Sequence, residues 1–210
     1  MIPHSVDITG IPFASKKSQQ LPIRILMVAQ YIPRKGHDLL AKAIRLLLDR
    51  GLSGFEVRLV GTQDPAWLNS IIESEKLNDV IQVLGVLKGE ALFEEFEHAD
   101  FFVLTSRFDT FAVVVHEAAA FGLPLLISKF AESSSLMVQE GINGYVIDPY
   151  KTEELADRIE ELISQPEKRR LMGNRSRAVA ELLCASKLGS ELATWLVNFH
   201  QRFLRDRRNT

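Results

Sequence analysis

The chain has 210 residues, of which 46% are hydrophobic and 25% charged, and its formal net charge is −2. These values are typical of a globular domain that can bury a core, and the charge argues against a nucleic-acid-binding protein, which normally has a strong basic excess. The single cysteine, Cys184, excludes an intrachain disulfide and fits a reducing compartment.

Targeting signals are weak at both ends of the sequence. The N-terminus lacks the basic start and apolar centre of a signal peptide, and the longest apolar run, 111–127, is interrupted by polar residues, glycine and proline. The basic end RFLRDRRNT could touch acidic lipid headgroups, although an exposed helix end explains it as well. We therefore expect a cytoplasmic protein with at most peripheral contact at the inner membrane face, and no nucleic-acid partner.

Apolar runs and helical stripes alternate along the chain. The apolar, β-branched run Ile23–Val28 predicts a buried strand, and the apolar stripe over 38–50, ended by Gly51, predicts a helix. Further strands are expected at 56–60, 80–84, 101–104, 125–128 and 145–147. Further helices are expected at 65–76, 89–97, 111–121, 133–139, 153–163, from Pro166 onward and at 188–204.

This alternation predicts an α/β fold: a single Rossmann-like domain whose parallel sheet is covered by helices on both faces, followed by C-terminal helices. We divide the chain into a linker-like segment at 1–20, this domain at 21–186, and a C-terminal helix with a basic tail at 187–210. In such a sheet, ligands bind where the carboxyl ends of the strands lead into helices.

Two carboxylates flank a predicted helix start in the stretch TSRFDTFAVVVHEAAAFGLPLLIS. Asp109 lies just before the helix expected from Phe111, and Glu117 follows about six residues into it, roughly 9 Å along its axis. The free N–H groups and dipole of the helix N-terminus between them attract anions. Two hydroxyl-binding carboxylates around an anion site suit a sugar joined to a phosphate. From the residues alone, Asp109 could equally cap the helix and Glu117 could be exposed.

This stretch resembles the E-x7-E signature of the family 4 retaining glycosyltransferases (glycosyl transferases group 1), which have the two-domain GT-B fold. Other segments resemble that family in the same order along the chain: IPHSVD, VAQYIPRKGHDLLAKA, LVGTQD, IQVLGVL, ADFFVLTS, EGINGYVIDP and the helix beginning near Thr152. The resemblance covers nearly the whole chain. It implies the C-terminal, donor-binding half of a GT-B enzyme, with 21–186 as its nucleotide-sugar-binding domain.

The resemblance also implies roles for individual residues. Lys35 would bind the donor diphosphate, Glu117 the ribose hydroxyls and Asp109 the hydroxyls of the donor sugar. Without the resemblance, we would interpret Lys35 as a solvated lysine beside a turn glycine. Lys35 and Asp109 are our candidate catalytic residues. The expected donor-binding set is Gln30, Lys35, Gly36, Val86, Asp109, Thr110, Phe111, Ala112, Val113 and Glu117. No metal or other cofactor is expected, because Lys35 and the helix N-terminus would carry the positive charge.

Three contact positions depart from the family pattern. The usual Gly-Arg after the first strand is Ala29-Gln30, the usual Phe-Gly is Phe111-Ala112, and Asp109 is one methylene shorter than glutamate. Gln30 lacks the charge and fork of arginine, so donor affinity could fall about 10–100-fold. The substrate could differ, or the activity could be weaker.

The sequence leaves alternative origins and functions of the chain open. The chain starts at the segment that resembles the interdomain linker, so we expect a partner N-terminal acceptor-domain subunit, a fragment of a longer protein, or the product of a disrupted reading frame. A non-catalytic nucleotide-sugar-binding or protein-interaction module is the main alternative, and a GT-B sugar-nucleotide epimerase is less similar. His116 is expected to pack rather than to react. The sequence has no G-x-S-x-G, P-loop or G-x-G-x-x-G motif to favour a hydrolase, NTPase or dinucleotide enzyme.

Overall fold

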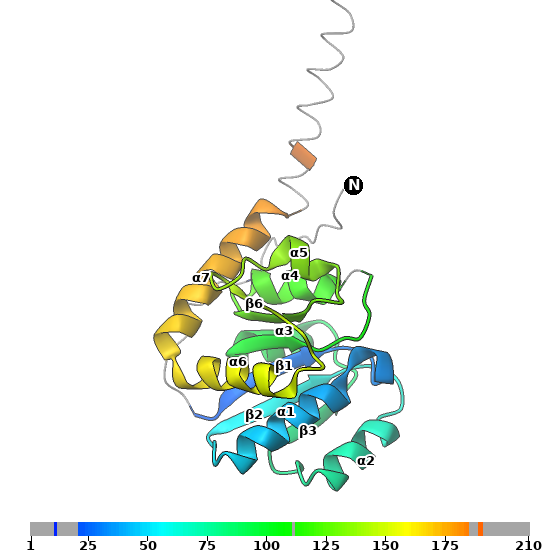
Figure 1. The fold of residues 1–210 in the computed structure, drawn as a ribbon. Coiled ribbons are helices and arrows are strands. Elements are labelled where there is room, and N and C mark those ends of the chain that lie inside the picture. The colour runs from blue at the N-terminus through cyan, green and yellow to red at the C-terminus, as the bar shows by residue number, and fades with distance from the viewer. Residues whose placement is uncertain (1–10, 12–20, 111, 185–188, 191–210) are drawn as a thin grey trace, which may run out of the picture.

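The computed structural model describes residues 11, 21–110, 112–184 and 189–190. Within them, six strands form one sheet in the order β3-β2-β1-β4-β5-β6, and every neighbouring pair is parallel (Figure 1). The strands are β1 (Ile23–Val28), β2 (Phe55–Val60), β3 (Ile81–Gly85), β4 (Phe101–Leu104), β5 (Leu125–Ser128) and β6 (Gly144–Ile147). The predicted α/β fold with a parallel sheet is confirmed.

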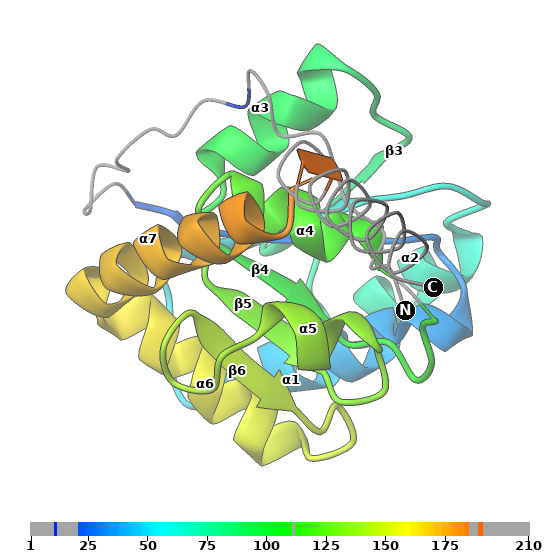
Figure 2. The same cartoon turned by 90° about the horizontal axis from the view of Figure 1, so that it is seen from above.

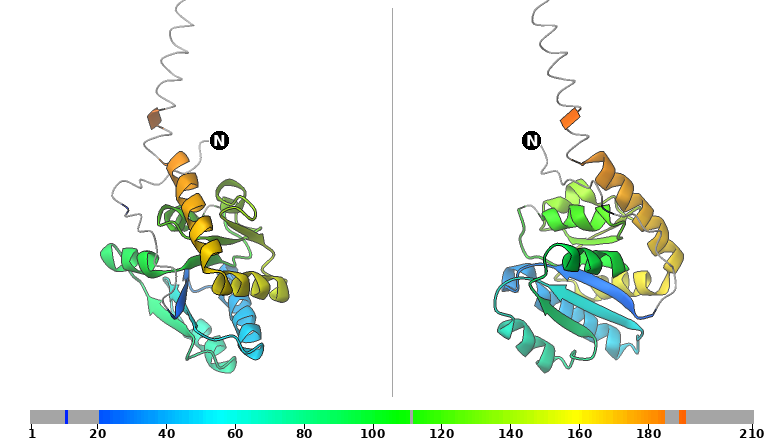
Figure 3. Two further views of the ribbon diagram at one scale, coloured as in Figure 1. Left: turned by 90° about the vertical axis from the view of Figure 1, so that its left-hand side faces the viewer. Right: turned by 180° about the vertical axis from the view of Figure 1, so that it is seen from behind.

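Helices cover both faces of this sheet. They are η1 (Pro33–Lys35), α1 (His37–Asp49), α2 (Ala66–Ser74), α3 (Glu90–His98), α4 (Val113–Ala120), α5 (Ser133–Met137), α6 (Thr152–Ser164) and α7 (Pro166–Leu182). On one face α1 contacts α2 and α6, and on the other α4 contacts α5 and α7 (Figure 2). The helix α7, yellow to orange in Figure 3, runs along the outside of the domain and contacts α4.

The central strands are apolar because both of their faces are covered. All four residues of β4 and all four of β5 are buried, and β1 alternates little between its two sides. The register of β1 against β2 runs from Ile23 opposite Phe55 to Val28 opposite Val60. The carboxyl ends of the central strands therefore lie at one edge of the sheet.

The order of the strands reverses direction between β1 and β4. After β1 the chain crosses to β2 on one side, and after β4 it crosses to β5 on the other. The loops that leave β1 and β4 consequently diverge toward opposite faces. This is the point of a doubly wound sheet at which ligands bind.

Three helices differ from the prediction by two residues at one end, and the first of them, α2, ends at Ser74 and not at Lys76. The helix α4 begins at Val113, not at Phe111, because Ala112 has the non-helical dihedrals φ −81° and ψ 86°. The helix α5 ends at Met137 and not at Gln139, because Val138 is extended and the amide of Gln139 donates to Asn143 Oδ1 at 2.7 Å. The predicted segments at 1–20 and 188–204 fall mostly outside the described residues.

Candidate donor-binding site

The lysine predicted to bind phosphate lies on a single helical turn after β1. Pro33 begins this turn, Lys35 ends it, and Gly36 follows with φ +73°. A Cβ on Gly36 would come within 2.0 Å of the Thr105 carbonyl oxygen, so this position needs glycine for its space as well as for its dihedral angle. The Thr105 hydroxyl donates to the Gly36 carbonyl at 2.8 Å. The β1–α1 turn is thus seated directly against the end of β4.

Lys35 and Asp109 form an ion pair across the two diverging loops. Lys35 Nζ lies 2.5 Å from Asp109 Oδ2, and the two side chains are only 13% and 9% exposed. The Asp109 amide donates to the Phe130 carbonyl at 3.0 Å, and the Glu132 amide donates to the Asp109 carbonyl at 3.1 Å. Asp109 is therefore held by the next loop along the sheet. Asp109 is not a cap of α4, which was the alternative interpretation of this residue.

The N-terminus of α4 follows Asp109 closely. No side chain caps this helix among the described residues. Thr110 is exposed, Ala112 is buried and Val113 is 40% exposed, whereas Phe111, also assigned to the site, lies outside the described residues. The start of α4 thus follows the ion-paired Asp109 by four residues, and its first N–H groups have no side-chain cap among the described residues. That these groups bind an anion stays a prediction.

Glu117 lies on α4, four residues after its first residue, or about 6 Å along the axis rather than the 9 Å expected from an earlier start. The side chain is half-buried and makes no hydrogen bond or ion pair with any described residue. Burial raises the pKa of its carboxyl above the ordinary value. This carboxylate has free acceptor capacity, which ribose hydroxyls would suit.

The remaining donor-site candidates, Gln30 for the diphosphate and Val86 for the base, lie at the ends of β1 and β3. Gln30 is exposed, and Val86 is 55% exposed immediately after β3. Between them the buried Tyr31, which the sequence did not single out, donates its hydroxyl to the Leu59 carbonyl at 2.9 Å and accepts from the Gly85 amide at 3.0 Å. Tyr31 thus holds the turn that leads into Val86, and burial raises its pKa.

Two buried histidines flank the site region. Neither ring nitrogen of His37 has a hydrogen-bond partner among the described residues, and burial lowers its pKa to about 4, so the ring is neutral at pH 7. The ring of His37 lies edge-on to Tyr31, with centroids 5.6 Å apart. His116 Nε2 lies 3.2 Å from the Ala180 carbonyl, which links α4 to α7. The contact of His116 is the structural one that we expected.

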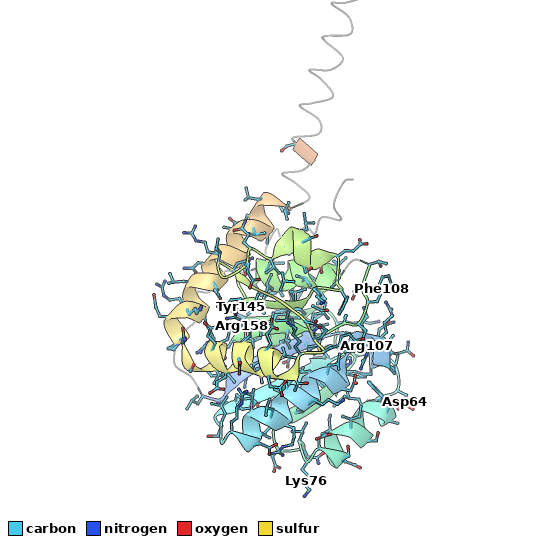
Figure 4. All side chains as sticks on the ribbon, viewed as in Figure 1. Asp64, Lys76, Arg107, Phe108, Tyr145 and Arg158 are labelled. Atoms are coloured by element: carbon cyan, nitrogen blue, oxygen red, sulfur yellow. The ribbon has the colours of Figure 1, made fainter. Side chains whose placement is uncertain are left out.

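Charged residues on the two loops also pair beyond Lys35 and Asp109. Arg107, two residues before Asp109, forms a bidentate ion pair with Asp38 at 2.7 and 2.6 Å. Figure 4 shows Arg107 and Phe108 on the side of the molecule where α1 begins. No local pattern singles out Arg107, because its partner Asp38 is 69 residues away in the sequence.

The described residues contain no group of three or more histidine, cysteine, aspartate or glutamate side chains placed to bind a metal ion. No helix within the described ranges is long and apolar enough to cross a membrane.

The sequence model for glycosyl transferases group 1 matches residues 11–179 of the chain. The chain belongs to this family. This group 1 chain is 26% identical over 171 residues to the alpha-D-kanosaminyltransferase of Streptomyces kanamyceticus, covering 80% of itself and 44% of that protein. It therefore spans less than half the length of this curated relative.

Solved structures give the same fold for this group 1 chain. It matches the C-terminal domain of a glycosyl transferase group 1 family protein from Francisella tularensis with a TM-score of 0.73 at 18% identity, over 84% of the chain and 97% of that domain. It matches the pneumococcal O-GlcNAc transferase, solved with UDP and GlcNAc, with a TM-score of 0.75 at 19% identity, over 92% of the chain and 38% of that protein. The expected correspondence to the C-terminal half of a GT-B fold is confirmed.

Proposed function

We propose that the chain is the donor-binding half of a retaining glycosyltransferase that uses a nucleotide-diphosphate sugar. One observation carries this proposal: a cation, Lys35, and a carboxylate, Asp109, meet at the switch point of the sheet beside a helix start that no described side chain caps. Membership of the group 1 family adds support. The similar pneumococcal enzyme was solved with UDP, which makes UDP a reasonable first ligand.

The proposed arrangement of the donor follows from the charges. The ammonium of Lys35 and the N-terminus of α4 would bind the diphosphate, Gly36 would let it approach the backbone, and Glu117 would accept hydrogen bonds from the ribose. Asp109 would bind hydroxyls of the sugar. The base would lie against Val86, whose exposed side chain and preceding Gly85 leave the main chain accessible.

The proposed reaction is a substitution with retention. The bond between the anomeric carbon and the diphosphate oxygen breaks, and the acceptor oxygen forms a bond to the same face of that carbon. The acceptor's proton passes to an oxygen of the leaving phosphate. Lys35 and the dipole of α4 stabilise the charge on that phosphate, so the proposal requires no metal ion.

The acceptor site belongs to this proposal too. Because the chain covers only 44% of its kanosaminyltransferase relative, we place acceptor binding in an N-terminal domain, either elsewhere in a longer chain or in a separate subunit. The 210-residue chain alone should then show negligible transfer. A cytoplasmic location, with at most peripheral membrane contact, completes the proposal.

A second candidate is a non-catalytic nucleotide-sugar-binding module. The specific observation in its favour is that Lys35 is already neutralised by Asp109, while Gln30 and Ala112 depart from the family pattern near the same phosphate position. Such a module would bind nucleotide without supporting transfer even when an acceptor domain is supplied.

Calorimetric titration with UDP, GDP and ADP tests the site. Lys35→Ala and Glu117→Ala should each weaken binding of the preferred nucleotide about tenfold or more, because each removes a charged contact. Lys42→Ala and Glu73→Ala, at exposed helix positions, are matched controls that should leave affinity unchanged. Unchanged affinity in both site variants, or no binding of any nucleotide by the unmodified chain, would refute the proposed function.

A further inference from the structure

Arg107 connects the two loops that carry Lys35 and Asp109. Its backbone N–H donates to the Arg34 carbonyl at 2.8 Å. Its guanidinium donates from Nη1 to the Pro33 carbonyl at 2.5 Å, and from Nη1 and Nη2 to the two carboxylate oxygens of Asp38 at 2.7 and 2.6 Å. One side chain on the β4–α4 loop therefore makes three hydrogen bonds to the β1–α1 segment.

These contacts enclose the phosphate-binding lysine. Pro33 lies two residues before Lys35 and Asp38 lies three residues after it, so Arg107 holds the turn at both ends. The Pro33 carbonyl also accepts the Gly36 amide at 3.1 Å, which closes the same turn. A planar guanidinium with a fixed fork restricts both position and orientation of its partners, which an ammonium cannot do.

The same guanidinium reaches a third loop. Its Cζ lies 5.8 Å from the centroid of the Tyr150 ring, which packs edge-on against Phe130 with centroids 5.8 Å apart. The carbonyl of Phe130 accepts the amide of Asp109. Arg107 thus contacts the backbone beside Lys35 directly, and the backbone beside Asp109 through the rings of Tyr150 and Phe130.

We propose that Arg107 is a positioning residue that fixes the turn carrying Lys35 and so preorganises the diphosphate site. The inference rests on the proposed function for its ligand, but the geometry it describes can be measured without one. The ion pair with Asp38 is partly buried, with side chains 29% and 20% exposed, and solvent still screens its charges. The main effect of the pair is to fix the position of the turn that carries Lys35. A displacement of a binding group by about 1 Å can reduce affinity or rate by a large factor.

The first arm of the test compares Arg107→Ala with a matched arginine. Arg58 on β2 also forms a bidentate pair, with Glu95 at 2.5 and 2.6 Å, and it joins β2 to α3 away from the two loops. Arg107→Ala should weaken UDP, GDP or ADP binding about tenfold at a temperature where the protein is fully folded, whereas Arg58→Ala should lower the melting temperature without changing affinity. Arg107→Lys should restore only part of the loss, because lysine keeps the charge and loses the fork. Equal affinity in Arg107→Ala and the unmodified chain would overturn the inference.

The second arm asks whether Arg107 acts through Lys35. If it does, the double variant Arg107→Ala/Lys35→Ala should bind no more weakly than Lys35→Ala alone, because the position of an absent ammonium no longer matters. Losses that multiply in the double variant would show that Arg107 contributes independently, and would overturn the positioning role.

The third arm needs no ligand and separates this inference from the proposed function. The amides of Lys35 and Gly36 donate to the Ile32 and Pro33 carbonyls at 2.9 and 3.1 Å. Their hydrogen exchange should be about tenfold faster in Arg107→Ala than in Arg58→Ala or the unmodified chain. If the unmodified chain binds no nucleotide, the proposed function fails, and the exchange rates alone decide the inference. Unchanged exchange would overturn it.

Discussion

Where β1 leads into α1, Lys35 and Asp38 each have a partner of opposite charge, whereas on α4 the carboxylate of Glu117 has no hydrogen bond or ion pair among the described residues. Lys35 pairs with Asp109, and Arg107 pairs with Asp38. Burial opposes ionisation of Asp38, but the hydrogen bonds and charge of Arg107, together with a backbone hydrogen bond and the charge of Lys42, outweigh it and lower the pKa of Asp38. On α4, burial alone raises the pKa of Glu117.

The difference implies that a ligand would meet two kinds of site. If a diphosphate binds at the β1–α1 end as proposed, it would have to compete with Asp109 for the ammonium of Lys35, and part of the binding energy would be lost in breaking that pair. At the α4 end, ribose hydroxyls would give a desolvated carboxylate the partners that it lacks. The contacts to the phosphates should therefore add little to the affinity for the nucleotide, and the contacts to the ribose should add more.

The largest expected effect comes from adding a cation at the phosphate end. Gln30 is exposed at the end of β1, and Gln30→Arg restores the residue that the family commonly has there. A charge-assisted hydrogen bond to phosphate contributes about 1.5–3 kcal/mol, so UDP should bind roughly 10–100-fold more tightly by calorimetry. Gln139→Arg, also exposed, controls for the added charge. An unchanged dissociation constant would mean that position 30 does not face the diphosphate and that this end is not limited by charge.

A smaller gain is expected when the competing carboxylate is removed. Asp109→Asn keeps the shape of the side chain but frees Lys35 from its ion pair and takes a negative charge from beside the phosphate. Inorganic pyrophosphate, which has neither base nor sugar, should bind about fivefold more tightly, corresponding to about 1 kcal/mol. Asp157→Asn breaks the exposed pair with Arg50 and should leave pyrophosphate binding unchanged.

Weaker pyrophosphate binding by Asp109→Asn would reverse the interpretation of the phosphate end. Asp109 would then hold Lys35 in its binding position instead of competing for it. The two ends of the site would no longer differ in the way proposed.

Sequence patterns predicted the fold because they report local properties. The apolar run of β1 and the stripe of α1 follow from burial and periodicity, and the switch-point rule then places Lys35 and Asp109 at one edge of the sheet. That these two form an ion pair is a property of side-chain conformation across 74 residues, which no local pattern contains.

The start of α4 and the contacts of Arg107 could not be predicted from the sequence, because both depend on residues that are far away along the chain. An aspartate before an apolar helix predicts a cap, but Asp109 is engaged by Lys35 and by the loop at Phe130, so the helix begins later, without a side-chain cap among the described residues. Arg107 reads as an ordinary surface arginine until Pro33 and Asp38 are placed beside it. The ligand-binding roles of these residues stay predictions.

The smallest expected effect is on stability at the ribose end. Because the folded-state pKa of Glu117 is raised, the carboxyl favours the folded state below the pKa of the unfolded chain, and this contribution is lost as the pH rises through the folded-state pKa. The glutamine of the Glu117→Gln variant cannot ionise, so the variant should have a larger free energy of unfolding than the unmodified chain at pH 7. The expected difference is a few tenths of a kcal/mol, because solvent screens a half-buried group. The two free energies should converge near pH 4. Urea denaturation at both pH values measures the difference, with Glu73→Gln as the exposed control. A Glu117→Gln variant that is less stable at pH 7 would show that the carboxylate has a stabilising partner, and the contrast between the two ends would disappear.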